Sequence, residues 1–280
     1  MSLNLMYITN DPNIARIAQS CGVNRIFVDM EYLGKEKRQS GMDTVKLHHT
    51  IRDIEAVRPI LNSTELLVRV NPIHDSTAEC ESSKDEINAA IQAGADVVML
   101  PMIKTREEAA EFVDYVGGRA KTMLLIETAE ANEGIEEILS VDGIDEVHIG
   151  LNDMHLAYKK RFMFELLVDG TVDRLCEIFR KKGIPYGFGG IARLGYGMLP
   201  AEKVIAEHYR LGSTKAILSR SFCNANELKD IEAVDALFKS EILKIREYEK
   251  VVEKYSDEEF MANHREVERI VNDIICAMRG

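Results

Sequence analysis

The sequence predicts an α/β fold, a (β/α)8 TIM barrel followed by a C-terminal helical extension. Short runs rich in Val, Ile and Leu alternate with amphipathic helical patterns, at a spacing of roughly 20–35 residues. The chain has 280 residues, a length typical of such a barrel with an addition. From residue 226 onward only helical periodicity remains. We therefore expect a catalytic barrel over residues 1–225 and, over 226–280, helices that pack on the barrel or on a neighbouring subunit.

The expected strands share an apolar run that stops at a polar residue, a glycine or a proline. In chain order they are Leu3–Ile8, Arg25–Glu31, Glu65–Asn71, Asp96–Leu100, Met123–Glu127, Val147–Gly150, Tyr186–Ile191 and Lys215–Arg220.

The expected helices show apolar residues at three- and four-residue spacing, with capping residues or glycines at their ends. They are Pro12–Cys21, Asp43–Leu61, Asp85–Ala93, Thr105–Val116, Ala129–Ser140, Asp169–Lys182, Pro200–Leu211, Asn226–Ser256 and Asp257–Met278.

Composition restricts the partners and the cell compartment. A net charge of −12 and a pI near 5.2 make nucleic acid an improbable ligand, because phosphate binding needs a basic face. The five cysteines are scattered and never form a Cys-x-x-Cys pair, which favours reduced thiols in the cytosol. No signal peptide is evident, and no apolar run approaches the ~20 residues of a membrane span. We expect a soluble cytoplasmic protein that binds no membrane.

The chain is organised around the stretch Lys121–Asp153, which reads as strand, helix and strand. The two strands of such a unit lie parallel, so Glu127 and Asp153 would both follow the carboxyl ends of neighbouring strands, where ligands bind. Two carboxylates there could share one hard cation, Mg²⁺ or Mn²⁺. The alternative is that each acid only caps the helix that follows it.

Further polar residues end the other strands and should meet at the same mouth. Strand two ends in Asp29 and Glu31, which share one face with Phe27 because side chains alternate. Arg69 sits within the apolar third strand, and a buried arginine is costly unless it is paired or functional. Its structural alternative is a salt bridge to Glu31 or Glu127.

Five segments in sequence together resemble the HpcH/HpaI aldolase and citrate lyase β-subunit superfamily, whose members are phosphoenolpyruvate/pyruvate-domain TIM barrels. The segments follow one another in family order and cover about residues 1–225. They are Phe27–Glu31, Arg69–Pro72, Met99–Met102, Ile126–Thr128 and Ile149–Asp153.

The resemblance implies a metal-dependent carbon–carbon lyase that acts through an enolate. It assigns Glu127 and Asp153 as ligands of Mg²⁺ or Mn²⁺, and Arg69 as the group that holds the oxygen on which enolate charge develops. It implies that Glu31 orients a metal-bound water with support from Asp29. The residues that would contact the substrate are Gly150, Leu151 and Asn152, through backbone N–H groups, together with Arg69, Pro101 and Met102.

Two features depart from the aldolase pattern. Where the aldolase branch has a proton-transferring histidine after the strand-two acids, this chain has Tyr32. Tyr32 is a candidate catalytic residue because tyrosine can move a proton, although its ordinary pKa of ~10 suits a base poorly near neutrality. Metal-bound water, His48, His49 or His155 could substitute. The second departure is the short link Gly117–Ala120 before strand five, which is more similar to the citrate lyase branch and its coenzyme A thioesters.

The stretch around strands seven and eight occupies the place where many barrels hold a phosphate. Its glycines Gly187, Gly189 and Gly190, with Ser219–Ser221 and Arg193, could bind an anionic aldehyde. A tight turn against the barrel wall is the preferred alternative.

The predicted activity is the reversible cleavage of a 4-hydroxy-2-oxo acid to pyruvate, or a related oxo acid, and an aldehyde. One rival is a citrate lyase-like or malyl-coenzyme A lyase-like enzyme acting on an acyl-coenzyme A. The other is a barrel that binds metal and oxo acid but has lost turnover. Apolar stripes on the two C-terminal helices predict assembly into a homo-oligomer.

Overall fold

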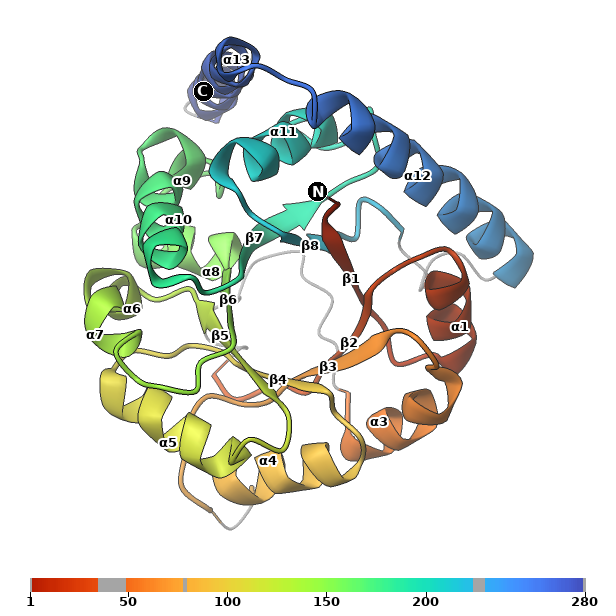
Figure 1. Cartoon of the computed structure of the whole chain (residues 1–280), viewed down its shortest axis with the longest axis vertical. Coiled ribbons are helices and arrows are strands. Elements are labelled where there is room, and N and C mark those ends of the chain that lie inside the picture. The colour runs from red at the N-terminus through yellow and green to blue at the C-terminus, as the bar shows by residue number, and fades with distance from the viewer. Residues whose placement is uncertain (1, 35–48, 78–79, 224–229, 279–280) are drawn as a thin grey trace.

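The computed structural model describes residues 2–34, 49–77, 80–223 and 230–278. Eight parallel strands close into a barrel in chain order, with β8 paired to β1, and helices surround it (Figure 1). The strands are β1 (Asn4–Ile8), β2 (Arg25–Asp29), β3 (Glu65–Arg69), β4 (Val97–Leu100), β5 (Lys121–Ile126), β6 (Glu146–Ile149), β7 (Tyr186–Ile191) and β8 (Lys215–Leu218). The predicted TIM barrel is confirmed.

The helices follow the strands in the order expected of this fold. Around the barrel lie α1 (Pro12–Ser20), α3 (Ile51–Val57) with the 3₁₀ turn η1 (Arg58–Ile60), α4 (Ser83–Gln92), α5 (Arg106–Val116), α6 (Ala129–Glu133), α7 (Ile135–Ile138), α8 (Leu151–Ala157), α9 (Glu165–Val168), α10 (Thr171–Lys182) and α11 (Ala201–Leu211), and the C-terminal pair is α12 (Ile231–Val252) and α13 (Asp257–Ala277).

Two expected helices differ from the structure, and two short helices were not expected. Among the described residues of the helix predicted over Asp43–Leu61, α3 begins at Ile51, because Thr50 is extended and forms a capping box with Asp53. Residues 43–48 of this prediction lie outside the described part. The single helix predicted over Ala129–Ser140 is divided at Gly134, and β6 is followed by two short helices that periodicity did not reveal.

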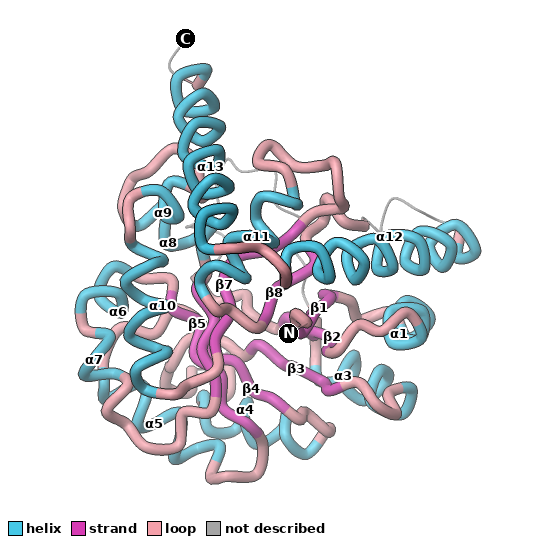
Figure 2. The backbone as a smooth tube through the Cα atoms, turned by 45° about the horizontal axis from the view of Figure 1, so that its top comes forward, coloured by secondary structure: helices cyan, strands magenta, loops and turns pink. Residues whose placement is uncertain are grey.

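The last two helices extend the barrel in different directions. α12 packs against α1 and α11, whereas α13 packs against α11 and α9 and projects away from the strands (Figure 2). Ser256 caps α13 with Glu259, so the helix break falls where the sequence predicts it. None of the helices that the structure describes is long and apolar enough to cross a membrane.

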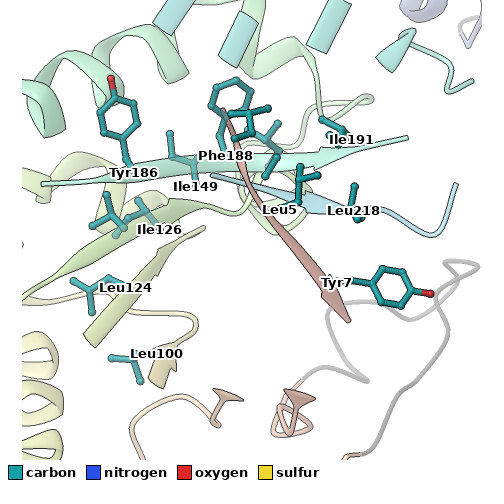
Figure 3. Close-up of a cluster of buried hydrophobic side chains, with 14 of the residues drawn as sticks. Leu5, Tyr7, Leu100, Leu124, Ile126, Ile149, Tyr186, Phe188, Ile191 and Leu218 are labelled. Atoms are coloured by element: carbon teal, nitrogen blue, oxygen red, sulfur yellow. The ribbon is translucent and has the colours of Figure 1, made fainter. Parts of the chain in front are cut away.

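Most of the apolar core lies between the strands and the surrounding helices. Leu124 and Ile126 of β5 and Ile149 of β6 point outward into it, beside Phe188 of β7 (Figure 3). Alternate residues therefore face the barrel interior. A second, smaller apolar cluster fills the middle of that interior and consists of Phe27, Leu67, Val97, Met99, Met123 and Leu125.

Charged side chains occupy both ends of the barrel interior. At the amino-terminal end of the strands, buried Arg25 binds Glu146 through two hydrogen bonds and Glu65 through a third. At the carboxyl end, Asp29, Arg69 and Glu127 follow the inward-facing Phe27, Leu67 and Leu125 by two residues each, so strand alternation brings them to one mouth.

Candidate active site

Arg69 and Asp29 form a buried ion pair across neighbouring strands. They are direct neighbours in the β2–β3 register. Nε of Arg69 donates to Oδ1 of Asp29 at 2.8 Å and Nη2 donates to Oδ2 at 2.7 Å, while Nη1 lies 3.3 Å from Oε2 of Glu31. Burial by itself lowers the pKa of Arg69, but the charges of Asp29 and Glu31 outweigh it and raise that pKa. The arginine therefore keeps its positive charge although it is buried.

Glu127 is a buried carboxylate held at the end of β5. Its Oε1 accepts a hydrogen bond from the N–H of Met102 at 3.0 Å. Met102 adopts a left-handed conformation, with φ of 54°, which is uncommon for a side chain without a special local role. Burial and the charge of nearby Asp153 raise the pKa of Glu127 to about 8, although Arg69 opposes the shift.

The capping alternative for Glu127 is wrong. Thr128, not Glu127, caps α6, because its side chain accepts the N–H of Ala131. Asp153 lies in the first turn of α8, which begins at Leu151. As the predicted strand–helix–strand unit requires, β5 and β6 are parallel neighbours, with Ile126 opposite Ile149. Both acids therefore follow adjacent strand ends.

One cavity of about 570 Å³ opens at this mouth. Of the predicted site residues, those that line it are Asp29, Arg69, Glu127, Gly150, Leu151, Asn152 and Asp153. Glu31, Tyr32, Pro101 and Met102 are not among the described residues of its wall. Glu31 and Met102 still contact the site indirectly, through Arg69 and Glu127 respectively.

Two assigned roles need correction. The N–H of Gly150 donates to the carbonyl of Ile126 at 2.9 Å, so it is committed to the backbone rather than offered to a substrate. Tyr32 directs its O–H to Sγ of Cys80 at 3.1 Å, and its N–H donates to Oδ1 of Asn71 at 2.9 Å. These contacts fix Tyr32 in the loop after β2 and leave its hydroxyl outside the cavity wall.

The histidines named as substitutes lie in different places. His49 is buried and lines the cavity. His155 is also buried, but it is absent from the described cavity wall, and its Nδ1 lies 3.3 Å from the carbonyl of Leu151 in its own helix. His48 lies outside the described residues. Of the two histidines that the structure describes, it brings His49 to the cavity.

Sequence reasoning missed some of the wall. His148 lines the cavity from β6, and its Nε2 contacts the carbonyl of Gly189 at 3.1 Å. Burial lowers the pKa of His148 to about 4, so its ring is neutral. Its position two residues before Gly150 on the inward face was the available signal. Thr9 and Asn10 follow β1 and also line the cavity. They could have been predicted because residues that follow the carboxyl ends of barrel strands form the site.

The glycine-rich end of β7 fits the tight-turn interpretation. A Cβ on Gly189 would lie 2.7 Å from the Leu151 side chain, and one on Gly190 would lie 3.1 Å from the Ile217 carbonyl. Close packing therefore explains these glycines. Residues 219–221 do line the cavity, whereas Arg193 stacks over the ring of Tyr196 at 4.1 Å.

The donor set suits a hard divalent cation. Glu127 and Asp153 supply carboxylate oxygens, and their mutual repulsion is what a cation would relieve. A Cβ on Gly150 would lie 2.6 Å from Oε2 of Glu127, so the backbone is shaped closely around this oxygen. Among the described residues, no group of three or more His, Cys, Asp and Glu side chains could hold a metal. Two carboxylates suffice for Mg²⁺, which usually keeps waters or substrate oxygens as its other ligands.

Known proteins share this fold and parts of this sequence. A hydroxypyruvate/pyruvate aldolase from Rhizorhabdus wittichii is 26% identical over 189 residues, which cover 54% of this chain and 72% of that protein. The crystal structure of an HpcH/HpaI aldolase from Desulfitobacterium hafniense superposes with a TM-score of 0.61 at 16% identity, covering 83% of this chain and 93% of that one.

A second solved structure supports the same architecture. An HpcH/HpaI aldolase/citrate lyase family protein from Burkholderia cenocepacia gives a TM-score of 0.60 at 15% identity, over 83% of this chain and 95% of its own. Identities this low establish only the fold. The model of the HpcH/HpaI aldolase/citrate lyase family, however, matches residues 4–163, which span β1 to the loop after α8 and include every strand-end acid of the cavity. The chain therefore belongs to the HpcH/HpaI aldolase/citrate lyase family.

Proposed function

We propose that this protein is a metal-dependent aldolase that reversibly cleaves a 4-hydroxy-2-oxo acid to pyruvate, or a related oxo acid, and an aldehyde. The observation that carries the proposal is that Arg69, Glu127 and Asp153 lie together in the wall of one cavity. A guanidinium and a pair of cation-binding carboxylates around one cavity suit a substrate whose oxygen gains negative charge as a carbon–carbon bond breaks. The name of the R. wittichii relative supports this substrate class.

Glu127 and Asp153 would hold Mg²⁺ or Mn²⁺. When bound, the ion would act as a Lewis acid toward the oxygens of a 2-oxo acid. The raised pKa of Glu127 favours its protonated form near neutral pH, so loading the site requires that this proton be released.

Arg69 would stabilise the enolate oxygen. Three of its five N–H groups contact Asp29 and Glu31, which fixes the guanidinium plane before substrate arrives. A donor that needs no reorganisation stabilises developing charge more effectively than a mobile one. Asp29 would act as a positioning residue for Arg69 in this scheme.

The carboxylate of the oxo acid would lie against the start of α8. The N–H groups of Leu151 and Asn152, which line the cavity there, are the remaining predicted backbone donors. Beneath these strand-end residues, the apolar cluster that includes Phe27, Met123 and Leu125 fills the barrel interior.

The test is deuterium exchange of the pyruvate methyl group, followed by proton NMR with Mg²⁺ and without it. Exchange reports enolate formation and needs no aldehyde. We expect exchange that depends on Mg²⁺ and is lost in Glu127→Gln, which keeps the shape of the side chain but removes its charge. Exchange that persists in Glu127→Gln would contradict the assigned ligand.

The absence of any exchange in the wild type would reject the pyruvate aldolase. Acyl-coenzyme A thioesters would then be tested for cleavage, and Mg²⁺ binding without either reaction would identify a barrel that binds but does not turn over.

A further inference from the structure

The cavity wall changes in character along the chain. The charged groups of the site all precede residue 154 and are Asp29, Arg69, Glu127 and Asp153. From residue 162 onward, the described residues of the wall are mostly apolar side chains and glycines. Arg220 is their charged exception, and it is exposed. The earlier part of the wall therefore suits the oxo acid and its metal ion, whereas the later part suits a group without charge.

Two loop segments provide large apolar side chains in this later part, and we call their five residues the apolar wall. They are Phe162, Met163 and Phe164, between α8 and α9, and Met198 and Leu199, between β7 and α11. α8 follows β6, and β6 pairs with β7 in the barrel (Figure 1). The two segments therefore arise from neighbouring strands, one of which is also followed by an acid of the proposed metal site.

The first segment of the apolar wall is held by hydrogen bonds and by ring packing. The N–H groups of Arg161 and Phe162 donate to Oε1 of Glu165 at 2.7 and 2.8 Å. The rings of Phe162 and Phe164 pack edge to face, with centroids 5.4 Å apart, and both residues are buried. A preformed apolar surface binds a ligand without the cost of ordering its side chains. This segment therefore needs no rearrangement to receive an apolar group.

Met198, in the second segment, is open to solvent. It is 61% exposed although it lines the cavity. Gly197 precedes it with φ of 98°, and a Cβ there would lie 2.7 Å from the carbonyl oxygen of Leu199, so the turn that presents Met198 requires glycine. Exposed apolar surface beside a cavity is stabilised when a ligand covers it. The unbranched thioether side chain also adapts to groups of different shape.

The cavity is larger than an oxo acid requires. Pyruvate has few non-hydrogen atoms, and at the ~30 Å³ that one water molecule takes in the liquid they fill roughly 180 Å³. The cavity has about 570 Å³, so most of it remains for the second substrate. With the oxo acid at Arg69, Glu127 and Asp153, the apolar wall borders the remaining space.

We propose that the aldehyde partner carries an apolar substituent, an alkyl chain or a phenyl ring, which binds against the apolar wall. This proposal rests on the proposed aldolase function, which leaves the substituent open. A charged substituent would lose its water there without gaining a partner from the five side chains of the wall. Each CH₂ group that leaves water strengthens binding instead. Phe164 and Met198 lie beyond residue 163, where the match to the family model ends, so membership of the family does not assign their role.

The first measurement is the rate at which the full-length protein, with Mg²⁺, adds pyruvate to a series of aldehydes. We expect kcat/KM to rise about two- to fourfold for each CH₂ group from ethanal through butanal to hexanal. Succinic semialdehyde is the charged comparison, because it has nearly the length of pentanal but ends in a carboxylate that could meet Arg220. It should react roughly tenfold less efficiently than pentanal. A kcat/KM that does not change along the series, or a preference for succinic semialdehyde, would overturn the proposal.

The second measurement tests the contact with Met198. Met198→Ala shortens an exposed side chain, so we expect the variant to fold. Its kcat/KM should fall on the order of tenfold for hexanal and by about twofold at most for ethanal, because only the longer chain reaches residue 198. Equal losses for the two aldehydes would show that Met198 only supports its loop, and would overturn the proposed contact.

Met261→Ala is the matched control. Met261 is another exposed methionine, on α13, and it is not in the described cavity wall. The variant should keep the wild-type dependence of kcat/KM on chain length. If Met261→Ala weakened that dependence as strongly as Met198→Ala, the effect could not be assigned to the wall, and the proposed contact would be rejected.

A third measurement does not depend on turnover. The full-length protein, isotope-labelled in its methionine methyl groups, is titrated with 1-hexanol, an unreactive analogue of hexanal. The NMR signals of Met163 and Met198 are assigned by their loss in the alanine variants. We expect 1-hexanol to shift both signals, and unchanged signals would overturn the proposal. A wild type that exchanges no pyruvate protons would instead reject the proposed function, and the titration would still decide whether the apolar wall binds an alkyl chain.

Discussion

A Cβ atom on Gly150 would lie 2.6 Å from Oε2 of Glu127 and 2.8 Å from its Cβ. These residues follow parallel neighbouring strands, and the missing side chain of one leaves room for the carboxylate of the other. The other oxygen of Glu127 accepts the N–H of Met102. Glu127 is thus confined on both sides, and its position depends on glycine at 150.

Gly150→Ala should displace Glu127 and weaken the site more than the fold. The φ of Gly150 is −83°, which alanine tolerates, so the effect would come from the contact with Glu127. We expect a stability loss of about 1–3 kcal/mol from overpacking, measured by urea unfolding. Pyruvate methyl exchange should fall on the order of 10²-fold, because small displacements of catalytic groups are costly.

Gly134→Ala is the matched control. Gly134 has a negative φ. The atom nearest to a Cβ added there would be the carbonyl oxygen of Glu130, at 3.3 Å, and neither residue is in the described cavity wall. If it reduced exchange as strongly as Gly150→Ala, the loss could not be attributed to Glu127.

Arg69→Lys should abolish most enolate formation although the charge is kept. Lysine cannot reproduce the two parallel hydrogen bonds to Asp29 with a planar group. We expect methyl exchange to fall by about 10²–10³-fold, the usual effect of removing a fixed donor from developing charge. Arg58→Lys, at a partly exposed pair with Asp96, should stay within about twofold of wild type. A wild-type rate of methyl exchange in Arg69→Lys would show that enolate formation does not need the planar guanidinium and its two parallel hydrogen bonds to Asp29.

Tyr32→Phe tests whether the hydroxyl has a part in catalysis. Its O–H contacts Cys80, and its backbone N–H, which the variant retains, binds Asn71. We expect exchange and cleavage rates within about threefold of wild type and a stability loss of about 1 kcal/mol. A pH–rate profile that loses one limb in Tyr32→Phe would instead identify the hydroxyl as an acid or base of the reaction.

The docking of α13 on α11 should depend on pH through His264. Its Nδ1 lies 3.0 Å from Oε2 of buried Glu207, and this hydrogen bond raises the pKa of His264 although burial opposes it. Glu268, Asp173 and Arg210 also act on the ring. Because the folded pKa is above the unfolded value of ~6.5, the stabilisation is complete below that pH and is lost as pH rises through the raised pKa.

The expected result is that the difference in unfolding free energy between wild type and His264→Gln is larger at pH about 5.5 than at about 8.5. Arg269→Gln serves as control, because this exposed arginine on the same helix does not titrate in that range and its pairs are with Glu266 and Asp273. A difference that is independent of pH would show that His264 contributes by packing alone.

The sequence by itself determined the barrel and the ionic part of its mouth. Strand side chains alternate with a period of two, so the apolar pattern that identifies β2, β3 and β5 also fixes that Asp29, Arg69 and Glu127 face inward. Their meeting at one end follows from the parallel order of the strands. These features depend on the two-residue alternation of side chains within each strand, and on the parallel strand order that the repeated strands and helices imply.

Only the tertiary structure decided which loop residues reach the cavity. Tyr32 is directed to Cys80, 48 positions away, and His49 meets Asp29 across 20 positions. The N–H of Met102 is aimed at Glu127 by a left-handed backbone that no periodic pattern predicts. Loops lack a repeating spacing, and their conformation is set by hydrogen bonds to partners distant in the chain, so their side chains could be placed only once the barrel had brought those partners together.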